Sequence, residues 1–281
     1  MAYRGRLAPT PTGLLHVGHA RTFALAARRA AGGNLVLRVE DLDASRCRAE
    51  FVTAALEDLA WLGLRWQEGP DVGGPHAPYT QSQRLPWFHE AWRRLHATGT
   101  IYPCDKSRRD VDHALGAPHA EDDAEPIFPP NLRPPAGAGA GATEPGTTNW
   151  RFRVPDGEVV EFTDALQGPR RFVAGRDFGD FLVWRRDGCP SYELAVVADD
   201  HAMGISEVVR GADLLLSTAR QLLLYRALRW QPPAWCHAPL VTGADGKRLA
   251  KRSAGLSIRE LRLRGRTAAE VIGAPIESLA A

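Results

Sequence analysis

Two histidines stand three residues apart in the segment APTPTGLLHVGH, residues 8–19. At helical pitch His16 and His19 share one face, and Gly18 between them removes a side chain, so a flat ring can approach the backbone. A helix that begins here would also offer its N–H groups and the positive end of its dipole to a phosphate. The segment therefore indicates a nucleoside triphosphate site, although two solvated histidines at a helix start would show the same pattern.

A basic segment near the other end of the chain, GKRLAKRS at residues 246–253, is a second candidate. Its cations, among them Arg248 and Lys251, could neutralise the charge that develops on a departing pyrophosphate, an interaction made mainly in the transition state. Taken alone, the segment is more typical of a solvated basic loop. The interpretation of this segment as a phosphate-binding element is favoured only when it is considered together with the histidine segment.

Four further residues could recognise carboxylate and ammonium groups. Arg6 and Arg210 can each pair with a carboxylate through two parallel hydrogen bonds. Glu40 can accept hydrogen bonds from an ammonium group, and Tyr192 offers a hydroxyl and an aromatic wall. We expect all four at strand ends or adjoining turns, where an open parallel sheet places its ligands. Surface ion pairs and a tyrosine at the edge of the core are the alternative interpretation.

The elements that would position these residues alternate between strand and helix in the first hundred residues. Residues 3–8 and 35–42 have the pattern of strands, and residues 14–31 and 46–62 have apolar residues at helical spacing. Another helix is expected at 86–98, with proline in its first turn. Strand, helix, strand and helix in this order predict a right-handed crossover and a parallel sheet.

The middle of the chain differs in kind, because the Pro/Gly/Ala stretch at 126–146 is typical of a loop. Short strand-like segments follow at 151–154, 159–162 and 181–186, and they predict a small antiparallel insertion. The α/β pattern then resumes and includes a long helix at 214–230.

The fold class expected is α/β: a Rossmann-like nucleotide-binding domain with a parallel sheet, a small inserted α/β subdomain and a short helical C-terminal tail. The expected divisions are the first half of the catalytic domain at 1–100, the inserted subdomain with the Pro/Gly-rich loop at 101–190, the second half at 191–245, and the basic loop with the tail at 246–281.

Composition narrows the class of protein. The 281 residues carry a net charge of +2 and are 44% hydrophobic, which excludes a polycationic nucleic-acid coat and wholesale disorder. An uninterrupted run of 18 apolar residues does not occur, and MAYRGRLAPT is no secretory signal, so we expect a cytoplasmic protein without a membrane span. The four cysteines have no CxxC spacing and predict no disulfide framework.

The motifs together resemble those of class I aminoacyl-tRNA synthetases. APTPTGLLHVGH is similar to the HIGH region of that family, and RLAKR looks like a degenerate form of its KMSKS loop. The segments RLAPTPTGLLHVGHART, LRVEDLD and YELAVVADDH…ISEVVRGADLL resemble the glutamyl branch. The similarity runs in order from about residue 4 to 253.

The resemblance implies that L-glutamate is activated with ATP and Mg²⁺ to form glutamyl-adenylate. It implies catalytic roles for His16, Gly18, His19 and Lys251. It implies ATP binding by Pro9, Thr10, His16, His19, Arg248 and Lys251. It implies glutamate binding by Arg6, Ala8, Thr10, Glu40, Tyr192 and Arg210.

Two departures from the glutamyl branch refine the expectation. Only 30 residues follow Lys251, so no large anticodon-binding part is expected. The chain then resembles a truncated branch that transfers glutamate to queuosine in the anticodon stem-loop of tRNA(Asp), and we expect a monomer. The alternatives are the catalytic core of a discriminating or non-discriminating glutamyl-tRNA synthetase and a catalytically silent tRNA-binding paralogue; Ala250 stands where the family usually has serine.

The second departure concerns a structural zinc site that relatives often carry. Cys104 is retained, but Lys106, Phe128 and Leu132 stand where the other ligands would be. One thiolate without soft partners cannot make a four-coordinate zinc centre, so we predict that zinc is lost and that the protein has no metal site of its own. A rebuilt site that uses His113 and His119 is the alternative.

Overall fold

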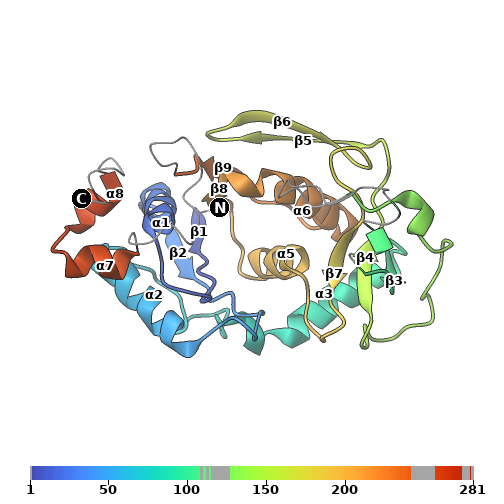
Figure 1. The fold of residues 1–281 in the computed structure, drawn as a ribbon, viewed down its shortest axis with the longest axis horizontal. Coiled ribbons are helices and arrows are strands. Elements are labelled where there is room, and N and C mark those ends of the chain that lie inside the picture. Colours follow the sequence, from blue (N-terminus) through green and yellow to red (C-terminus); the bar gives the residue numbers. More distant parts are fainter. Residues whose placement is uncertain are drawn as a thin grey trace.

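The computed structural model describes residues 2–107, 110–111, 114, 127–241, 257–273 and 279. The first half of the α/β unit alternates strand and helix (Figure 1). Its elements are β1 (Arg4–Leu7), α1 (Val17–Arg29), β2 (Asn34–Leu37) and α2 (Ala49–Trp61). β1 and β2 pair in parallel, with Arg6 opposite Val36. The crossover through α1 therefore has the predicted parallel arrangement.

A second parallel pair is formed by two strands from the second half of the chain. These are β8 (Glu207–Gly211) and β9 (Ala234–Ala238), which pair in parallel with Val208 opposite Trp235. β8 lies against β1, because the amide of Ser206 donates to the carbonyl of Arg4 at 2.8 Å. With β8 beside β1, the carboxyl ends of the two parallel pairs lie close together, and ligands bind at such ends in open α/β sheets.

Two pieces of β-structure interrupt the α/β unit. One is an antiparallel sheet of β3 (Ile101–Cys104), β4 (Asn149–Phe152) and β7 (Phe181–Trp184). The other is a hairpin of β5 (Val159–Asp164) and β6 (Gly168–Val173). The hairpin does not join the antiparallel sheet as expected, because β5 pairs in parallel with β9, Asp164 opposite Trp235. The inserted region thus supplies strands to both sheets, and the hairpin lies above α6 in Figure 1.

Helices bury the sheets in two large apolar clusters. One cluster joins β1, β2, α1 and α2 to the C-terminal helices, and the other joins the helices of the second half to the antiparallel sheet. The remaining helices are α3 (Leu85–Ala97), α5 (Tyr192–Ala202), α6 (Leu215–Leu228), α7 (Ile258–Leu263) and α8 (Ala268–Gly273), with short 3-10 turns at Gln81–Gln83, Pro130–Leu132 and Ala212–Leu214. In the described ranges no helix is long and apolar enough to cross a membrane.

Candidate active site

A cavity of about 780 Å³ lies where the carboxyl ends of β1, β8 and β9 meet the start of α1. All the predicted site residues that the structure describes line it. They are Arg6, Ala8, Pro9, Thr10, His16, Gly18, His19, Glu40, Tyr192 and Arg210. Arg248 and Lys251 lie outside the described residues. The sequence separation within this set shows that the fold, and not a local motif, assembles the cavity.

The two histidines cap the helix whose start they mark. His16 is the N-cap of α1, and its Nδ1 accepts from the amide of Gly18 at 3.0 Å. The Nδ1 of His19 accepts from the amide of His16 at 3.2 Å, and the two rings stack with centroids 3.8 Å apart. In a neutral imidazole whose Nδ1 accepts, Nε2 carries the proton and donates. These amides are thus bonded within the helix start, and the proton of each neutral imidazole lies on Nε2.

Gly18 is required by the packing of the same turn. A Cβ atom added at Gly18 would lie 2.9 Å from Cε1 and 3.0 Å from Nδ1 of His16. Contacts this short force the imidazole to move, which would break the bond from the Gly18 amide. Because residue 18 has no side chain, the cavity wall is flat at the helix start, and a planar ring of a nucleotide can lie against it.

Arg210 lies at the opposite side of the cavity, in β8, and its residue is 4% exposed. Its Nε donates to Nε2 of His237 at 3.1 Å, and its Nη2 donates to Oγ1 of Thr218 at 2.8 Å. Its Nη1 lies 3.3 Å from the hydroxyl of Tyr192. Within the described part of the chain no carboxylate forms an ion pair with Arg210, and its hydrogen bonds are with neutral groups.

Tyr192 departs from the predicted position at a strand end. It is the first residue of α5, directly after the N-cap Ser191, whose hydroxyl accepts from the amide of Leu194. The residue remains 40% exposed, so its ring forms part of the cavity wall and its hydroxyl reaches Arg210. The helix start therefore places the aromatic side chain that a strand end was expected to place.

Arg6 and Glu40 belong to a buried network of charges beside the cavity. Arg38 donates to Glu40 at 2.9 Å and to Asp200 at 2.7 Å, and Arg6 lies 3.8 Å from Asp200. Burial raises the pKa of the Glu40 carboxyl, and the Arg38 and Arg6 guanidiniums oppose that shift. Burial lowers the pKa of Arg6, and Asp200 opposes this. Glu40 therefore depends on Arg38 to stay ionised and able to accept from an ammonium group.

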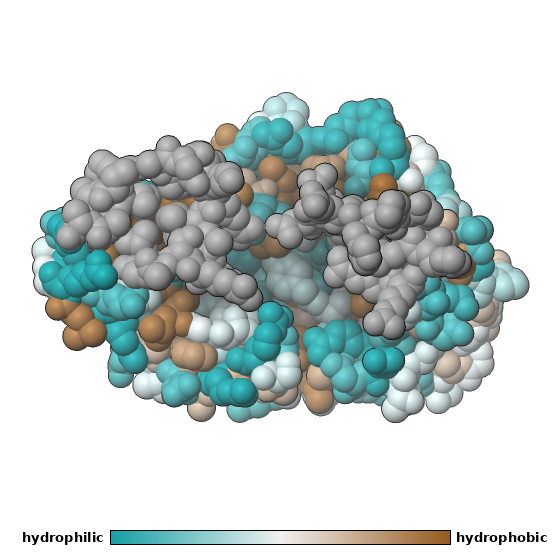
Figure 2. All heavy atoms as spheres, viewed as in Figure 1, coloured by the Kyte–Doolittle hydropathy of each residue, from teal (hydrophilic) through white to brown (hydrophobic). Residues whose placement is uncertain are grey.

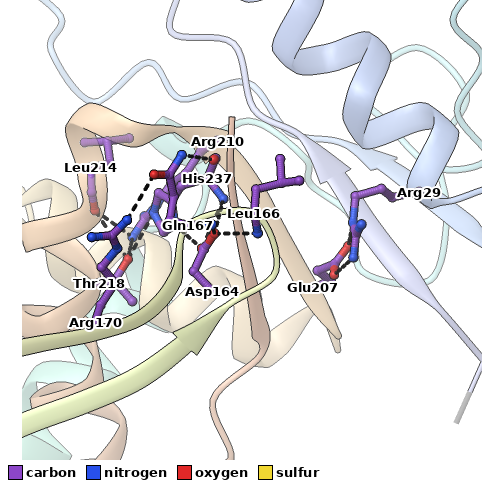
Figure 3. A network of polar contacts seen from close by, with 10 residues as sticks. All are labelled: Arg29, Asp164, Leu166, Gln167, Arg170, Glu207, Arg210, Leu214, Thr218 and His237. Carbon is purple, nitrogen blue, oxygen red and sulfur yellow. Dashed lines mark hydrogen bonds and ion pairs between the residues drawn. The ribbon is translucent and has the colours of Figure 1, made fainter. Parts of the chain in front are cut away.

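Three residues in contact with Arg210 or its partner were not singled out from the sequence. They are Asp164 at the end of β5, Thr218 in α6 and His237 in β9 (Figure 3). Asp164 and His237 are 73 positions apart and have no common motif, so no local spacing could have paired them. Arg38 did carry a signal, because a lone cation inside the apolar run LVLRV is unusual unless it is paired.

The residues around Cys104 do not fit a zinc ion. Cys104 is 4% exposed and packs with Tyr102, Val111 and Phe128, with Leu132 against the cluster. No group of three potential metal ligands occurs among the described residues. His113 and His119 lie outside them, so the alternative of a rebuilt site is not described. The apolar surroundings of the thiol match the chemistry of an ordinary core cysteine.

Comparison with known proteins gives a matching family and two similar proteins. The family model described as tRNA synthetases class I (E and Q), catalytic domain, matches residues 2–270. A "Glutamyl-Q tRNA(Asp) synthetase" of Symbiobacterium thermophilum is 48% identical over 96% of this chain and 84% of its own length. A protein of the same name from Nitratidesulfovibrio vulgaris is 46% identical over the same shares.

A solved structure resembles the chain in three dimensions as well. It is a glutamate tRNA ligase from Elizabethkingia meningosepticum in complex with its amino acid, with a TM-score of 0.74 and 28% sequence identity. The similarity covers 90% of this chain and 52% of that chain, so this chain spans about half of the length of that ligase.

Proposed function

This chain belongs to the catalytic-domain family of class I tRNA synthetases for glutamate and glutamine, and on that premise we propose that it activates L-glutamate with ATP and transfers it to queuosine in tRNA(Asp). The relatives with the greatest identity reported above carry the name of that activity. The RNA partner we propose is the anticodon stem-loop, bound by a monomer in the cytoplasm, where ATP and tRNA are found.

The observation that carries the proposal is that Arg210 is buried and has no carboxylate partner among the described residues. A guanidinium that is 96% buried normally has a carboxylate beside it, because an unpaired charge is costly to remove from water. Arg210 lines the cavity and, among the described residues, contacts only neutral acceptors. A ligand carboxylate in the cavity would supply the missing partner. The side chain of glutamate has this group, and its ammonium group would face Glu40.

The remaining roles follow from position in the cavity. We assign Arg6, Ala8, Thr10, Glu40 and Tyr192, with Arg210, to the glutamate end. We assign Pro9, Thr10, His16, Gly18 and His19 to the ATP end, together with Arg248 and Lys251 of the basic loop. The segment after β1 is held in place because the carbonyl of Pro9 accepts from the amide of Glu40 at 3.0 Å.

The chemistry needs alignment and charge neutralisation from this chain, and no protein nucleophile. The α-carboxylate of glutamate attacks the α-phosphorus of ATP, and pyrophosphate leaves. The Nε2–H groups of His16 and His19 donate to phosphate oxygens as charge moves onto the leaving group. Mg²⁺, which the family implies, would be held chiefly by the phosphates and would supply further neutralisation. A hydroxyl of the modified base then attacks the acyl carbon and releases AMP.

The decisive experiment uses an isolated anticodon stem-loop of tRNA(Asp) that carries queuosine. This RNA has no acceptor end, so its glutamylation would locate the attachment in the loop. We expect radiolabelled glutamate to be transferred to it in the presence of MgATP. The matched control is the same stem-loop with guanosine in place of queuosine, which should remain unlabelled.

The opposite pattern would favour another member of the same family. Failure on the queuosine stem-loop together with efficient charging of unmodified tRNA(Glu) would assign the chain to ordinary glutamyl-tRNA synthetases. Absence of ATP–pyrophosphate exchange with glutamate, with or without RNA, would favour a silent RNA-binding protein.

A further inference from the structure

A hydrogen-bonded chain runs from the inserted hairpin to the amino-acid end of the cavity. Asp164, the last residue of β5, lies 2.6 Å from Nδ1 of His237 in β9. His237 in turn accepts through Nε2 from Nε of Arg210 at 3.1 Å. Figure 3 shows the three side chains, with Thr218 on the other branch of the guanidinium. Asp164 and His237 are 2% and 0% exposed, so neither serves the solvent surface.

Asp164 fixes which nitrogen of His237 carries the proton. Its carboxylate also accepts from the backbone amides of Leu166 at 3.0 Å, Gln167 at 2.9 Å and His237 at 3.1 Å. A carboxylate that accepts this many bonds is ionised, and an ionised carboxylate can only accept. The proton of the neutral imidazole therefore lies on Nδ1, which leaves Nε2 as an acceptor. In the other tautomer, an N–H of the ring would face the N–H of Arg210.

The hydrogen bonds to neutral groups fix the orientation of the Arg210 guanidinium without neutralising its charge. His237 takes Nε, and Thr218 with the carbonyl of Leu214 takes Nη2 at 2.8 and 3.4 Å. The guanidinium also lies over the ring of Trp235, with its carbon 5.0 Å from the ring centroid. Only Nη1 is directed to Tyr192 and the cavity wall. A carboxylate in direct contact at the position of His237 would compete with the substrate for the positive charge, whereas a neutral imidazole does not.

We propose that Asp164 and His237 are positioning residues, which hold the Arg210 guanidinium toward the side-chain carboxylate of the substrate and so set the preference for glutamate over glutamine. This inference rests on the proposed function, because it assumes that glutamate occupies the cavity. Glutamine would present an amide to the same guanidinium and lose the charge-assisted bond. The inserted hairpin, through the last residue of its first strand, thus takes part in substrate selection.

The test measures ATP–pyrophosphate exchange by the whole chain with glutamate and with glutamine. Asp164→Asn keeps the size of the side chain and removes the charge that fixes the tautomer. We expect the KM for glutamate to rise about ten- to a hundredfold, the loss of one charge-assisted hydrogen bond. The KM for ATP should stay within about twofold, and the ratio of kcat/KM for glutamate over glutamine should fall. Loss of kcat alone, with an unchanged KM for glutamate, would show a merely structural role.

A double-mutant cycle shows whether the effect passes through Arg210. In an Arg210→Ala background, Asp164→Asn should change the KM for glutamate little, because the group that it positions is gone. Fully additive effects would overturn the inference. Glu161→Gln is the matched control, since Glu161 lies in the same strand with its side chain 67% exposed, and it should behave as wild type.

Two further outcomes keep the inference separate from the function on which it rests. If Asp164→Asn is insoluble, Thr218→Val removes a hydroxyl that accepts from Nη2 of Arg210 at 2.8 Å and lies 3.1 Å from Nε2 of His237, and it should give the same rise in KM for glutamate. A wild-type chain that exchanges pyrophosphate with glutamate while neither variant shifts that KM would overturn this inference only. A wild-type chain inactive with glutamate would overturn the proposed function.

Discussion

Two buried arginines at the cavity have different surroundings, and this difference assigns them different tasks. Arg6 lies 3.8 Å from Asp200 and donates to the carbonyl of Val209 at 2.8 Å, so part of its charge is already balanced. Arg210 hydrogen-bonds only neutral groups within the described residues, so no carboxylate there is in direct contact with it. We therefore expect Arg210 to contribute more binding energy to a ligand carboxylate than Arg6 does.

Arg210→Ala and Lys251→Ala should have distinct kinetic effects. Removal of Arg210 takes away the partner of the substrate carboxylate, so the KM for glutamate should rise while the KM for ATP changes little. Removal of Lys251, which we assign to pyrophosphate in the transition state, should lower kcat for adenylate formation about 10²–10³-fold with little change in glutamate affinity. Steady-state exchange kinetics would measure both, and identical profiles would contradict this division of roles.

His237 predicts a pH dependence of stability. Burial, with Arg210 nearby, lowers its pKa to about 4, although Asp164 opposes the shift. Between pH 6.5 and about 4 the unfolded chain therefore binds a proton that the folded chain does not, so stability falls as the pH falls through this window. Over about 2.5 pH units the loss approaches 3 kcal/mol. Urea unfolding from pH 7 to pH 4.5 should show a steeper loss for wild type than for His237→Gln, and parallel curves would refute the shift.

At the scale of single elements, the starts of two helices supply four of the described site residues. α1 begins with the two stacked histidines, and α5 begins with Ser191 and Tyr192. Both starts face the same cavity, where the positive ends of two helix dipoles favour negatively charged groups. The arrangement suits a substrate pair that carries phosphates and carboxylates.

The elements that sequence patterns predict well are those with local signals. α1, α2 and α3 repeat apolar residues at helical spacing, β1 is a short segment that stops before Pro9, and β2 begins a short apolar run after a Gly-Gly turn. β3, β6 and β9 were not predicted, because IYPC and GPRRFV contain proline and AWCHA has no β-branched residue. Such strands form because distant partners pair with them, as β9 does with β8 and β5.

The site shows the same division between local and distant signals. His16 and His19 could be identified because one helical turn contains both. The pair Asp164 and His237 could not, since it depends on the register in which an inserted hairpin meets β9. The wrong expectation for Tyr192 arose because a strand end and a helix start occupy neighbouring places at the carboxyl edge of the sheet.

From the surroundings of Cys104 at the end of β3, we predict that the protein folds and works without zinc. Cys104 packs among apolar side chains, and Lys106 forms an ion pair with Asp105 at 3.1 Å. Protein purified without added metal should contain much less than one zinc per chain by elemental analysis, and a chelator should leave its melting temperature unchanged. Stoichiometric zinc whose removal unfolds the chain would contradict this prediction and revive a Cys/His site.

At the scale of the whole molecule, a layer of buried charges links the first half of the chain to α5. Arg38 is 0% exposed and contacts Glu40 and Asp200, while Arg84 donates to Asp199 at 2.6 Å. Burial lowers the pKa of Arg38, but the carboxylates of Asp200 and Glu40 outweigh this effect and hold the pKa above its usual value. The layer joins the first half of the chain to α5, so it couples the site to the packing of the halves.

Arg38→Met should therefore lower both stability and glutamate affinity. The substitution leaves buried carboxylates without their cation, which typically costs about 3–5 kcal/mol in the free energy of unfolding. Glu40 would also lose the guanidinium that keeps it ionised, so the KM for glutamate should rise. Denaturant unfolding measures the first effect. Arg46→Met is the control, because Arg46 pairs with Asp43 at the surface with its side chain 70% exposed and should change stability by less than about 1 kcal/mol.

The hairpin of β5 and β6, which contributes Asp164 to the site, also determines how the edge of the sheet meets other molecules. Among the described strands β6 is the last in the order β6, β5, β9, β8, and it carries Pro169, Arg170 and Arg171. Figure 2 shows this edge of the molecule as largely hydrophilic. Proline lacks the N–H that a new strand would need, and two cations oppose the approach of an identical edge. Deletion of the hairpin would expose the apolar edge of β9, so loss of substrate selection and aggregation should occur together.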